Sequence, residues 1–472
     1  MKPTFMVAAP TSGSGKTTIA RGLMALLSQN GMKVQPFKCG PDYIDTKFHE
    51  AVCGRPSINL DMFMALKEHV RELFVHYGED ADVCVVEGMM GLFDGYDRDK
   101  GSSAEIAATL GVPVVLVVDA KSAAYSMAAL LQGFLNFRKD VHIAGVIFNK
   151  VGSERHYKML QQVCDDLGIE CYGYLPKQAS LEQSSRYLGL DFSEKTENAT
   201  LVSLLEAHVN WQHIVGEASK LCGSVVGEAS KLCGSEIVYE ASKLHDDRLI
   251  DDRKAWKLHP LRVMVARNSE AFSFLYQETI DRLGDVTFFD PEKDVPDLNN
   301  IDLLYLPGGY PEKHLEALVN NEACRKAIKD YAERGGRIIA ECGGMMYLCR
   351  SIVGEASKLC NSSPSLQSLE ASPTTDRRLQ SLEASPTKEY PMCGVLPYTI
   401  TARKADRKLS LGYRRFVLDG KEYRGHEFHY TQFVGNPPES ITQVYNAKGE
   451  PVDTPIFKYK NVLASYTHLY NI

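Results

Sequence analysis

Cys342 lies where an apolar run meets two glycines, in the segment GRIIAECGGMMYL at residues 336–348. This pattern predicts a strand, a sharp turn that exposes the thiol, and a helix that begins directly after the turn. The positive end of a helix dipole favours the thiolate, which is the nucleophilic form of cysteine. The segment therefore predicts a catalytic cysteine, and a buried structural thiol is the alternative.

Two further segments could assist this thiol. LLYLPGGYPE at residues 303–312 has the pattern of a strand that enters a glycine turn. The backbone N–H groups of Gly309 and Gly343 are therefore candidate donors to an oxyanion. VLASYTH at residues 462–468 predicts a short strand that ends in His468, a candidate base for the thiol. Other candidate bases are His426 and His429.

A phosphate-binding loop is predicted near the start of the chain, in APTSGSGKTT at residues 9–18. It follows a strand-like run and opens a helix-like run, as a P-loop does, although Pro10 stands where the motif has its first glycine. Glycines let backbone N–H groups surround phosphate oxygens, the lysine neutralises the β- and γ-phosphates, and the threonine hydroxyl binds Mg²⁺. The residues predicted to bind ATP are Gly13, Gly15, Lys16, Thr17 and Thr18.

Two further segments carry acidic residues where a strand-like run ends. They are KCGPDYID at residues 38–45 and EGMMGLFDG at residues 87–95. Open α/β sheets bind ligands at the carboxyl ends of their strands. Glu87 comes directly after the apolar run 83–86, so it is a candidate Mg²⁺ ligand, with surface solvation as the alternative. Asn149 ends another strand-like run and could contact the nucleotide base or cap its strand.

One chain thus combines a candidate nucleophile with a candidate ATP site. The simplest coupling is amide synthesis, in which the thiol releases ammonia and ATP activates a carboxylate. A formal net charge of −7 without a basic run argues against a nucleic-acid partner. No apolar run approaches about 20 residues, so no membrane span is expected. The absence of a signal-peptide pattern and of zinc-spaced cysteines favours a cytoplasmic protein with reduced thiols.

Two α/β domains are predicted to position these groups, one over residues 1–205 and one over residues 259–472. Strands and helices alternate in both, which predicts parallel sheets covered by helices on both faces. Predicted strands of the first domain are residues 4–9, 34–38, 83–87, 114–119 and 143–149. Helices are expected from Lys16, near Lys67, and from Ala104, Ala123 and Glu154. Predicted strands of the second domain are residues 261–266, 302–307 and 337–341.

Short repeats occur between and within these domains. Copies of VGEASKLC stand at residues 215–222, 226–233 and 353–360, and copies of SLEASPT at residues 368–374 and 381–387. The units are too short and too polar for a solenoid, so we interpret them as surface insertions. One block lengthens a predicted linker at residues 206–258, and the other fills residues 353–388.

Together, these motifs resemble the cobyrinic acid a,c-diamide synthase family, enzymes of corrin (vitamin B12) biosynthesis. The resemblance covers nearly the whole chain outside the repeats. Besides the P-loop, it rests on GPDYID (40–45), EGMMGLFDG (87–95), PGGYPE (307–312), ECGG (341–344), GHEFHYT (425–431) and ASYTHLY (464–470). It implies an N-terminal domain similar to dethiobiotin synthetase and a C-terminal domain similar to class I glutamine amidotransferases.

The resemblance also implies residue roles. Cys342 would be the glutaminase nucleophile and His468 the histidine that activates it. Many amidotransferases have a glutamate two residues after this histidine, where this chain has Tyr470, so the third member of the triad stays open. The implied Mg²⁺ ligands are Thr17, Asp42 and Glu87, the implied catalytic acids of synthesis are Asp45 and Asp94, and the implied substrate-binding residues are Tyr43, Ile44 and His429.

The implied reaction is ATP- and glutamine-dependent amidation of the a and c side-chain carboxylates of cobyrinate, through an acyl phosphate. Its small-molecule partners would be the tetrapyrrole, ATP with Mg²⁺, and glutamine, and homodimerisation stays open. The same reaction on hydrogenobyrinate or nickel-sirohydrochlorin is the close alternative, whereas GPDYID and EGMMGLFDG argue against a cobyric acid synthase. A partitioning-type P-loop ATPase is a further alternative, which the intact Cys342 and His468 oppose.

Overall fold

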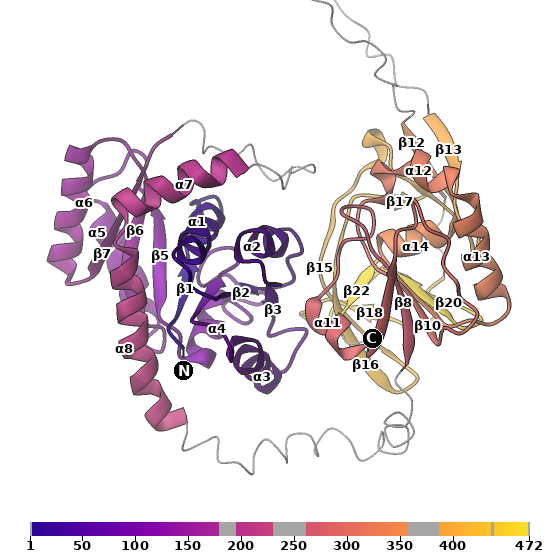
Figure 1. The fold of residues 1–472 in the computed structure, drawn as a ribbon, viewed down its shortest axis with the longest axis horizontal. Helices are drawn as coiled ribbons and strands as arrows, with labels where there is room; N and C mark the ends of the chain where they lie inside the picture. Colours follow the sequence, from indigo (N-terminus) through magenta and orange to yellow (C-terminus); the bar gives the residue numbers. More distant parts are fainter. Residues whose placement is uncertain (1, 179–194, 230–260, 356–386, 436–438, 471–472) are drawn as a thin grey trace, which may run out of the picture.

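The structure is a computed structural model that describes residues 2–178, 195–229, 261–355, 387–435 and 439–470. Figure 1 shows two α/β bodies side by side, an N-terminal one coloured indigo to magenta and a C-terminal one coloured orange to yellow. Each body contains its own predominantly parallel sheet, so the prediction of two α/β units is confirmed.

The N-terminal sheet has seven strands in the order β3-β2-β4-β1-β5-β6-β7, and all neighbouring strands run parallel. They are β1 (Thr4–Ala8), β2 (Val34–Cys39), β3 (Ile58–Leu60), β4 (Val83–Glu87), β5 (Val114–Asp119), β6 (Ile143–Val151) and β7 (Glu170–Pro176). The apolar runs predict five of these strands closely. They do not predict β3, which has only three residues, or β7, an edge strand that starts with an exposed glutamate and contains a glycine.

Helices cover both faces of this sheet (Figure 1). The helices on one face are α1 (Lys16–Gln29), α7 (Lys195–His208) and α8 (Trp211–Ala229), which share an apolar cluster. The helices on the other face are α3 (Lys67–Gly78), α4 (Ser103–Leu110), α5 (Met127–Phe137) and α6 (Glu154–Leu167). Successive side chains of β1 point to opposite faces of the sheet. Phe5 and Val7 pack in the cluster with α1, α7 and α8, whereas Met6 and Ala8 pack in the cluster with α3, α4, α5 and α6. The short helix α2 (Asp45–Cys53) follows β2.

The first copy of the octapeptide repeat belongs to α8 and is not a surface insertion. Ile214 and Ala218 of this helix are 2% and 1% exposed and pack in the cluster that contains β1. The apolar residues of the copy recur at helical spacing, which lets one face of the helix cover the sheet. Our interpretation as a surface insertion is therefore wrong for residues 215–221 of this copy, while residues 230–260 of the predicted linker lie outside the described residues.

The C-terminal body is built on a six-stranded sheet in the order β20-β21-β11-β10-β8-β9. Its strands are β8 (Arg262–Ala266), β9 (Asp285–Phe289), β10 (Leu303–Leu306), β11 (Ile338–Glu341), β20 (Ile456–Tyr459) and β21 (Val462–Ser465). All neighbours are parallel except β20 and β21. The helices of this body are α11 (Gln277–Arg282), α12 (Leu315–Asn320), α13 (Glu322–Glu333) and α14 (Gly343–Leu348).

Two smaller sheets complete the C-terminal body. One has the order β19-β18-β15-β16-β22, with β15 (Ser410–Leu418), β16 (Lys421–His429), β18 (Val444–Tyr445), β19 (Pro451–Val452) and β22 (Thr467–Leu469). The other has the order β13-β12-β14-β17, with β12 (Cys349–Glu355), β13 (Thr387–Pro391), β14 (Leu396–Thr401) and β17 (Gln432–Phe433).

The C-terminal run that carries His468 is two strands, not the single strand that the sequence predicts. β21 pairs with β11 in the central sheet, whereas β22 pairs antiparallel with β16 in a different sheet. The chain turns at Tyr466, where the N–H of Thr467 donates to Ser465 Oγ at 3.0 Å. This turn carries His468 away from the plane of the central sheet and places it opposite His426.

Aromatic side chains join the two bodies. Tyr43, which precedes α2, stacks on Phe274 with ring centroids 5.0 Å apart, and Phe63 packs on Tyr413 at 4.5 Å. The Tyr413 hydroxyl also donates to the buried carboxylate of Asp61 at 2.7 Å. The segments that hold the two groups of candidate residues therefore meet across a packed interface.

The second repeat block can be removed, we predict, with little effect. Glu355 ends β12, Thr387 begins β13, and the two residues form a pair of this antiparallel ladder, so a tight turn can join them. Replacing residues 357–385 by an Asn-Gly turn should leave turnover within a few-fold, since loop closure changes by only about 0.6 kcal/mol per doubling of length. Turnover and melting temperature of this variant test the prediction. A folded variant with more than tenfold lower turnover would contradict it.

Candidate active site

The phosphate-binding loop joins β1 to α1, and its backbone fits only glycine at two positions. Gly13 and Gly15 have φ values of 82° and 91°, in the region that side chains disfavour. The Asn149 amide packs directly on Gly15, where a Cβ would lie 2.0 Å from Nδ2. The same amide donates to the carbonyl of Ser14 at 2.9 Å. Asn149 therefore braces the loop, with Lys16, Thr17 and Thr18 in the helical turn that follows.

Oxygen atoms from three elements meet in front of this loop. Thr17 Oγ1 donates to Glu87 Oε1 at 2.6 Å and lies 3.4 Å from Asp45 Oδ2. A hydroxyl and carboxylates are the hard oxygen ligands that Mg²⁺ takes when nucleotide phosphates supply the rest of its coordination. Over the described ranges, no cluster of three or more His, Cys, Asp or Glu side chains could hold a metal ion by itself. The donor set therefore fits a Mg²⁺ ion that is shared with a nucleotide.

Lys38 is a site residue that the sequence patterns do not single out. Its Nζ lies 2.6 Å from Asp45 Oδ2, 3.0 Å from Glu87 Oε1 and 3.9 Å from Asp42 Oδ2. Burial lowers the pKa of Lys38, but the carboxylates of Asp45, Glu87 and Asp42 outweigh burial and hold it above its usual range. The sequence of β2 gives no local signal for this role, because the burial of Lys38 and its carboxylate neighbours become visible only in the fold.

His49 is a second residue found only in the structure. Its Nε2 lies 2.7 Å from Glu87 Oε2, and its Nδ1 lies 2.9 Å from Ser57 Oγ. Burial acts to raise the pKa of Glu87, but Lys38 and then His49 hold that pKa well below its usual range. Glu87 is therefore an ionised carboxylate with a fixed orientation, as a metal ligand requires.

The other predicted residues of this half lie around the same cluster. Asp42 Oδ1 accepts from the N–H groups of Ile44 and Asp45 at 2.8 and 3.0 Å, so it holds the turn before α2. Asp94 is exposed, and its Oδ2 accepts from the N–H of Gly91 at 3.0 Å. Lys16 Nζ donates to the Met90 carbonyl at 3.4 Å, which brings this second acidic loop beside the phosphate-binding loop.

Lys38 should also stabilise the fold. Replacing it by methionine leaves Asp45 and Glu87 as buried carboxylates without their cation, which should lower the free energy of unfolding by about 3 kcal/mol at pH 7. The depressed pKa of Glu87 contributes stability above its unfolded value, and this contribution is lost as pH falls through the folded value. The difference between wild type and Lys38→Met should therefore shrink in acid. Urea unfolding across pH tests this.

The exposed Lys67, in the same body, is the matched control. Lys67→Met should change the free energy of unfolding by less than about 0.5 kcal/mol. Equal stability of wild type and Lys38→Met at pH 7 would contradict the prediction.

Cys342 occupies the turn between β11 and α14 with φ 45° and ψ −106°, a strained conformation for a residue with a side chain. The thiol is not exposed as predicted, because Cys342 is only 3% exposed and its Sγ lies 3.8 Å from the Phe428 carbonyl. Burial, aided by the carboxylate of Glu312, raises the pKa of this thiol above its usual range. This effect outweighs that of the short helix, so the resting group is a thiol that needs a base.

The two predicted oxyanion donors lie together beside Cys342. A Cβ on Gly343 would lie 3.0 Å from the backbone nitrogen of Gly309 and 2.8 Å from Pro311 Cδ. Gly309 itself has φ 155°, and a Cβ there would lie 2.3 Å from the Ala271 carbonyl. Both positions therefore need glycine, and the backbones of Gly309 and Gly343 lie against each other beside Cys342, as the prediction of two oxyanion donors requires.

His468 is fully buried between the two bodies. Its ring lies 5.2 Å from that of Tyr43 and 5.8 Å from that of Phe274, and a Cβ on Gly308 would lie 2.1 Å from its Cε1. Neither ring nitrogen has a hydrogen-bond partner in the part of the chain that the structure describes, so no hydrogen bond joins it to Cys342. Burial, with His426 and His429 nearby, lowers the pKa of His468 to about 3. The ring is therefore neutral at pH 7 and can accept a proton.

The alternative histidines lie on β16 beside His468. His429 Nε2 lies 2.7 Å from Glu427 Oε1, and its ring stacks on Tyr466 with centroids 3.6 Å apart. Burial lowers the pKa of His426 to about 4. His429 is thus held by a carboxylate and an aromatic ring, whereas His468 has both nitrogens available.

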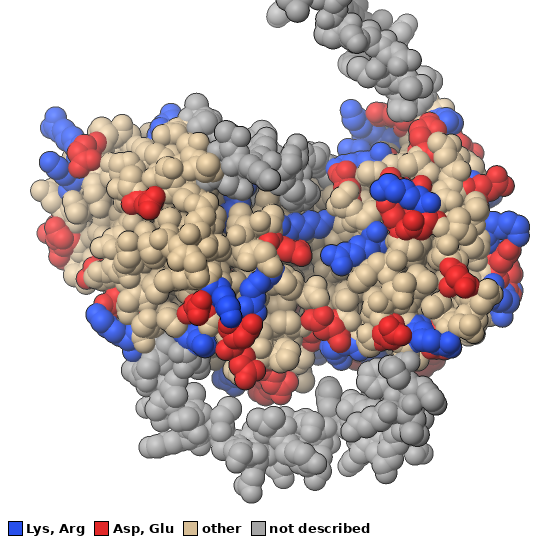
Figure 2. Space-filling view, viewed as in Figure 1, with Lys and Arg blue, Asp and Glu red and all other residues tan. Residues whose placement is uncertain are grey.

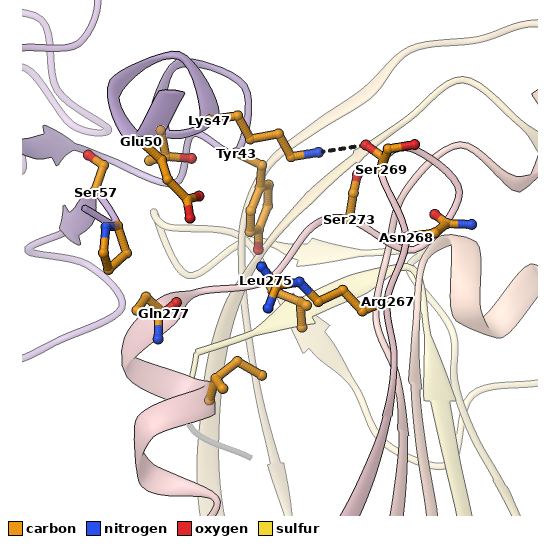
Figure 3. A pocket seen from close by; sticks show the side chains of 13 residues that line it. Tyr43, Lys47, Glu50, Ser57, Arg267, Asn268, Ser269, Ser273, Leu275 and Gln277 are labelled. Carbon is orange, nitrogen blue, oxygen red and sulfur yellow. Dashed lines mark hydrogen bonds between the residues drawn. The ribbon is translucent and has the colours of Figure 1, made fainter. Parts of the chain in front are cut away.

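A cavity of about 490 Å³ opens between the bodies. Figure 3 shows Tyr43 and Lys47 on its N-terminal side and Arg267 on its C-terminal side, with Lys47 Nζ bonded to the Ser269 carbonyl at 3.3 Å. Among the described residues that line the cavity, Glu50 is the only acidic one. The cavity thus lies between Tyr43 of the GPDYID segment and the basic side chains of Lys47 and Arg267. Such a lining suits an anionic ligand.

The surface carries charges of both signs. Figure 2 shows blue and red side chains interspersed over both bodies, with no basic stripe across this face. Among the described helices, none combines the length and apolar character that a membrane span requires.

Comparisons with known proteins agree with this geometry. Residues 5–188 match the model of the CobQ/CobB/MinD/ParA nucleotide binding domain, and residues 262–381 and 366–471 match the CobB/CobQ-like glutamine amidotransferase domain. The chain is 36% identical over 480 residues to the cobyrinate a,c-diamide synthase of Caldanaerobacter subterraneus subsp. tengcongensis, covering 98% of this chain and 94% of that protein. It is 36% identical to the hydrogenobyrinate a,c-diamide synthase of Brucella abortus and 34% to that of Rhizobium meliloti, with 98% of each chain covered.

Proposed function

The chain belongs to the family of cobyrinate and hydrogenobyrinate a,c-diamide synthases, and from this we propose that it amidates the a and c carboxylates of cobyrinate with ATP and glutamine-derived ammonia. The observation that carries the proposal is the contact between Tyr43 and His468, because it joins the phosphate-binding body to the thiol body. An ammonia molecule released near Cys342 would then have a short path to the activated carboxylate.

In the first stage, the phosphate-binding loop and Lys16 hold the phosphates of ATP, and the γ-phosphoryl group passes to a substrate carboxylate. Thr17, Glu87 and Asp42 would hold Mg²⁺, which supplies charge neutralisation of the phosphates. Lys38 keeps Asp45 and Glu87 in place, and Asp94 belongs to the loop after β4, whose Met90 carbonyl accepts from Lys16. Asp45 and Asp94 would act on the carboxylate and its acyl phosphate.

In the second stage, Cys342 attacks the side-chain amide of glutamine. His468 takes the thiol proton and returns it to the departing ammonia, while Gly309 and Gly343 donate to the oxyanion. Water then hydrolyses the thioester to glutamate, and ammonia displaces phosphate from the acyl phosphate. The packed interface between the bodies would keep bulk water from the acyl phosphate.

The cavity beside Tyr43 offers room for part of the tetrapyrrole, whose carboxylates would face Lys47 and Arg267. Arg267→Ala should therefore raise KM for the tetrapyrrole by about tenfold, the cost of one charge-assisted contact. Basal glutamine hydrolysis should stay within a few-fold of wild type. Steady-state kinetics with Lys67→Ala as the control test this, and an unchanged KM would place the tetrapyrrole elsewhere.

Mass spectrometry of tetrapyrroles incubated with ATP, Mg²⁺ and amide-¹⁵N glutamine tests the proposed function. Cobyrinate should gain two labelled amides. Parallel incubations with hydrogenobyrinate and nickel-sirohydrochlorin separate the three substrates, since the relatives carry the names of two of them. Absence of labelled amide on every substrate would refute the proposal.

A further inference from the structure

His468 is a buried base with no hydrogen bond to fix its ring. Neither ring nitrogen has a hydrogen-bond partner among the described residues, and the ring packs against Gly308, Tyr43 and Phe274. When it accepts a proton, an imidazolium forms in a site from which water is excluded. Such a charge is costly unless a carboxylate lies beside it.

Glu341 supplies a carboxylate at this position. Its Oε2 lies 4.0 Å from His468 Nδ1, and Glu341 is 2% exposed. Strands on two sides hold the group, because Tyr305 of β10 donates to Oε2 at 2.9 Å and the N–H of Leu469 on β22 donates to Oε1 at 3.0 Å. The 4.0 Å separation exceeds a hydrogen bond, and catalytic hydrogen bonds often tighten only when substrate binds.

Other carboxylates near the histidine are engaged elsewhere. Glu427 is bonded to His429, Arg414 and Thr454 at 2.5–2.7 Å. Tyr470, two residues after His468, has its hydroxyl bonded to Glu278 at the interface between the bodies.

We propose that Glu341 is the positioning residue of the glutaminase site, which accepts the Nδ1–H of His468 and balances the imidazolium charge. This inference rests on the proposed function. Nε2 then takes the proton of Cys342 as sulfur bonds to the amide carbon of glutamine. The same proton leaves on ammonia as the carbon–nitrogen bond breaks, so Nδ1–H stays in place throughout. The nucleophile and the group that orients its base are thus adjacent residues of one strand end.

The titratable groups around this pair come from several elements. His426, His429 and Glu427 of β16 act electrostatically on His468, and Tyr43 packs on it from the N-terminal body. Tyr305 and Tyr276 interact electrostatically with Glu341. Burial raises the pKa of Glu341 to about 8. The carboxylate that the mechanism needs therefore forms as pH rises, and glutamine turnover should rise through about pH 8.

Glu341→Gln is the direct test, because the amide keeps the shape and can still accept from Tyr305. Its kcat for glutamine hydrolysis should fall by at least about 100-fold with KM for glutamine little changed. Its rate should lose the rise near pH 8, whereas synthesis from ammonium salts should match wild type. Glu341→Asp should recover part of the lost turnover. Tyr470→Phe, the matched control, should stay within a few-fold of wild type.

Wild-type kcat and pH profile in Glu341→Gln would overturn the proposal. Equal loss of the glutamine and ammonia reactions in a folded variant would also overturn it, because the residue would then act on the whole fold. A wild-type protein that releases no glutamate from glutamine would instead refute the proposed function itself.

Discussion

Replacing Cys342 by alanine should abolish glutamine-dependent synthesis, by at least about 10³-fold, while ammonia-dependent synthesis continues. Without the thiol, no thioester forms and glutamine releases no ammonia. The predicted ATP site belongs to the N-terminal body, which holds the phosphate-binding loop, Lys38, Asp45 and Glu87. ATP should therefore still activate the carboxylate of the substrate. Product formation from glutamine and from ammonium salts at alkaline pH, measured side by side, tests this.

Cys393 provides the matched control, since it is a free, buried cysteine of the same body. Cys393→Ala should keep both reactions within a few-fold. His468→Ala should resemble Cys342→Ala, because the raised pKa of the thiol leaves it dependent on a base. Full glutamine-dependent synthesis by Cys342→Ala would disprove the role of this thiol, and loss of the ammonia reaction in a folded variant would disprove the division into two sites.

Lys16→Ala should give the opposite pattern. Synthesis should fall by at least about 100-fold with either nitrogen donor, because no charge then steadies the β- and γ-phosphates during transfer. Basal glutamine hydrolysis should survive, because Lys16 lies at the start of α1 in the N-terminal body, whereas Cys342 lies in the C-terminal body. Phosphate release and glutamate release, assayed separately in the same preparation, distinguish the two activities.

Lys67→Ala again serves as the control, because Lys67 is an exposed lysine of the same body. A Lys16→Ala protein that amidates its substrate with ammonia at the wild-type rate would show that this loop does not hold the transferred phosphate.

The sequence predicts those features that local patterns determine. Mainly apolar runs predict β1, β4, β5 and β6 to within two residues, because strands of a buried parallel sheet are apolar on both faces. β2 is predicted equally closely although it contains Gln35 and Lys38. The glycines at positions 13, 15, 309 and 343 likewise report a backbone requirement that is visible in the sequence.

Features that depend on pairing between distant segments could not be predicted in this way. The thiol of Cys342 contacts the Phe428 carbonyl of β16, and the carboxylate of Glu312 helps to raise its pKa, although both residues come from other parts of the chain. Lys38 becomes a site residue only because β2 lies next to β4. The split of the C-terminal run into β21 and β22 follows from two different partner strands, which no local pattern encodes.

The first octapeptide copy illustrates the same limit. Its sequence is compatible with a helix or with an insertion, and only the apolar face of the N-terminal sheet selects the helix. Propensity is a weak guide where tertiary packing decides the outcome.

The ring of Tyr43 has an energetic consequence that extends beyond its packing. Tyr43 belongs to the turn that carries Asp42 and Asp45, and the centroid of its ring lies 5.2 Å from that of the His468 ring. Any displacement of this turn by a ligand therefore alters the surroundings of His468, the proposed base of glutamine hydrolysis. Coupling between two binding sites is reciprocal, so a tetrapyrrole that tightens glutamine binding is itself bound more tightly, by the same factor, when glutamine is present. Contact through Tyr43 would thus link the binding of glutamine in the C-terminal body to the binding of the tetrapyrrole beside the N-terminal body.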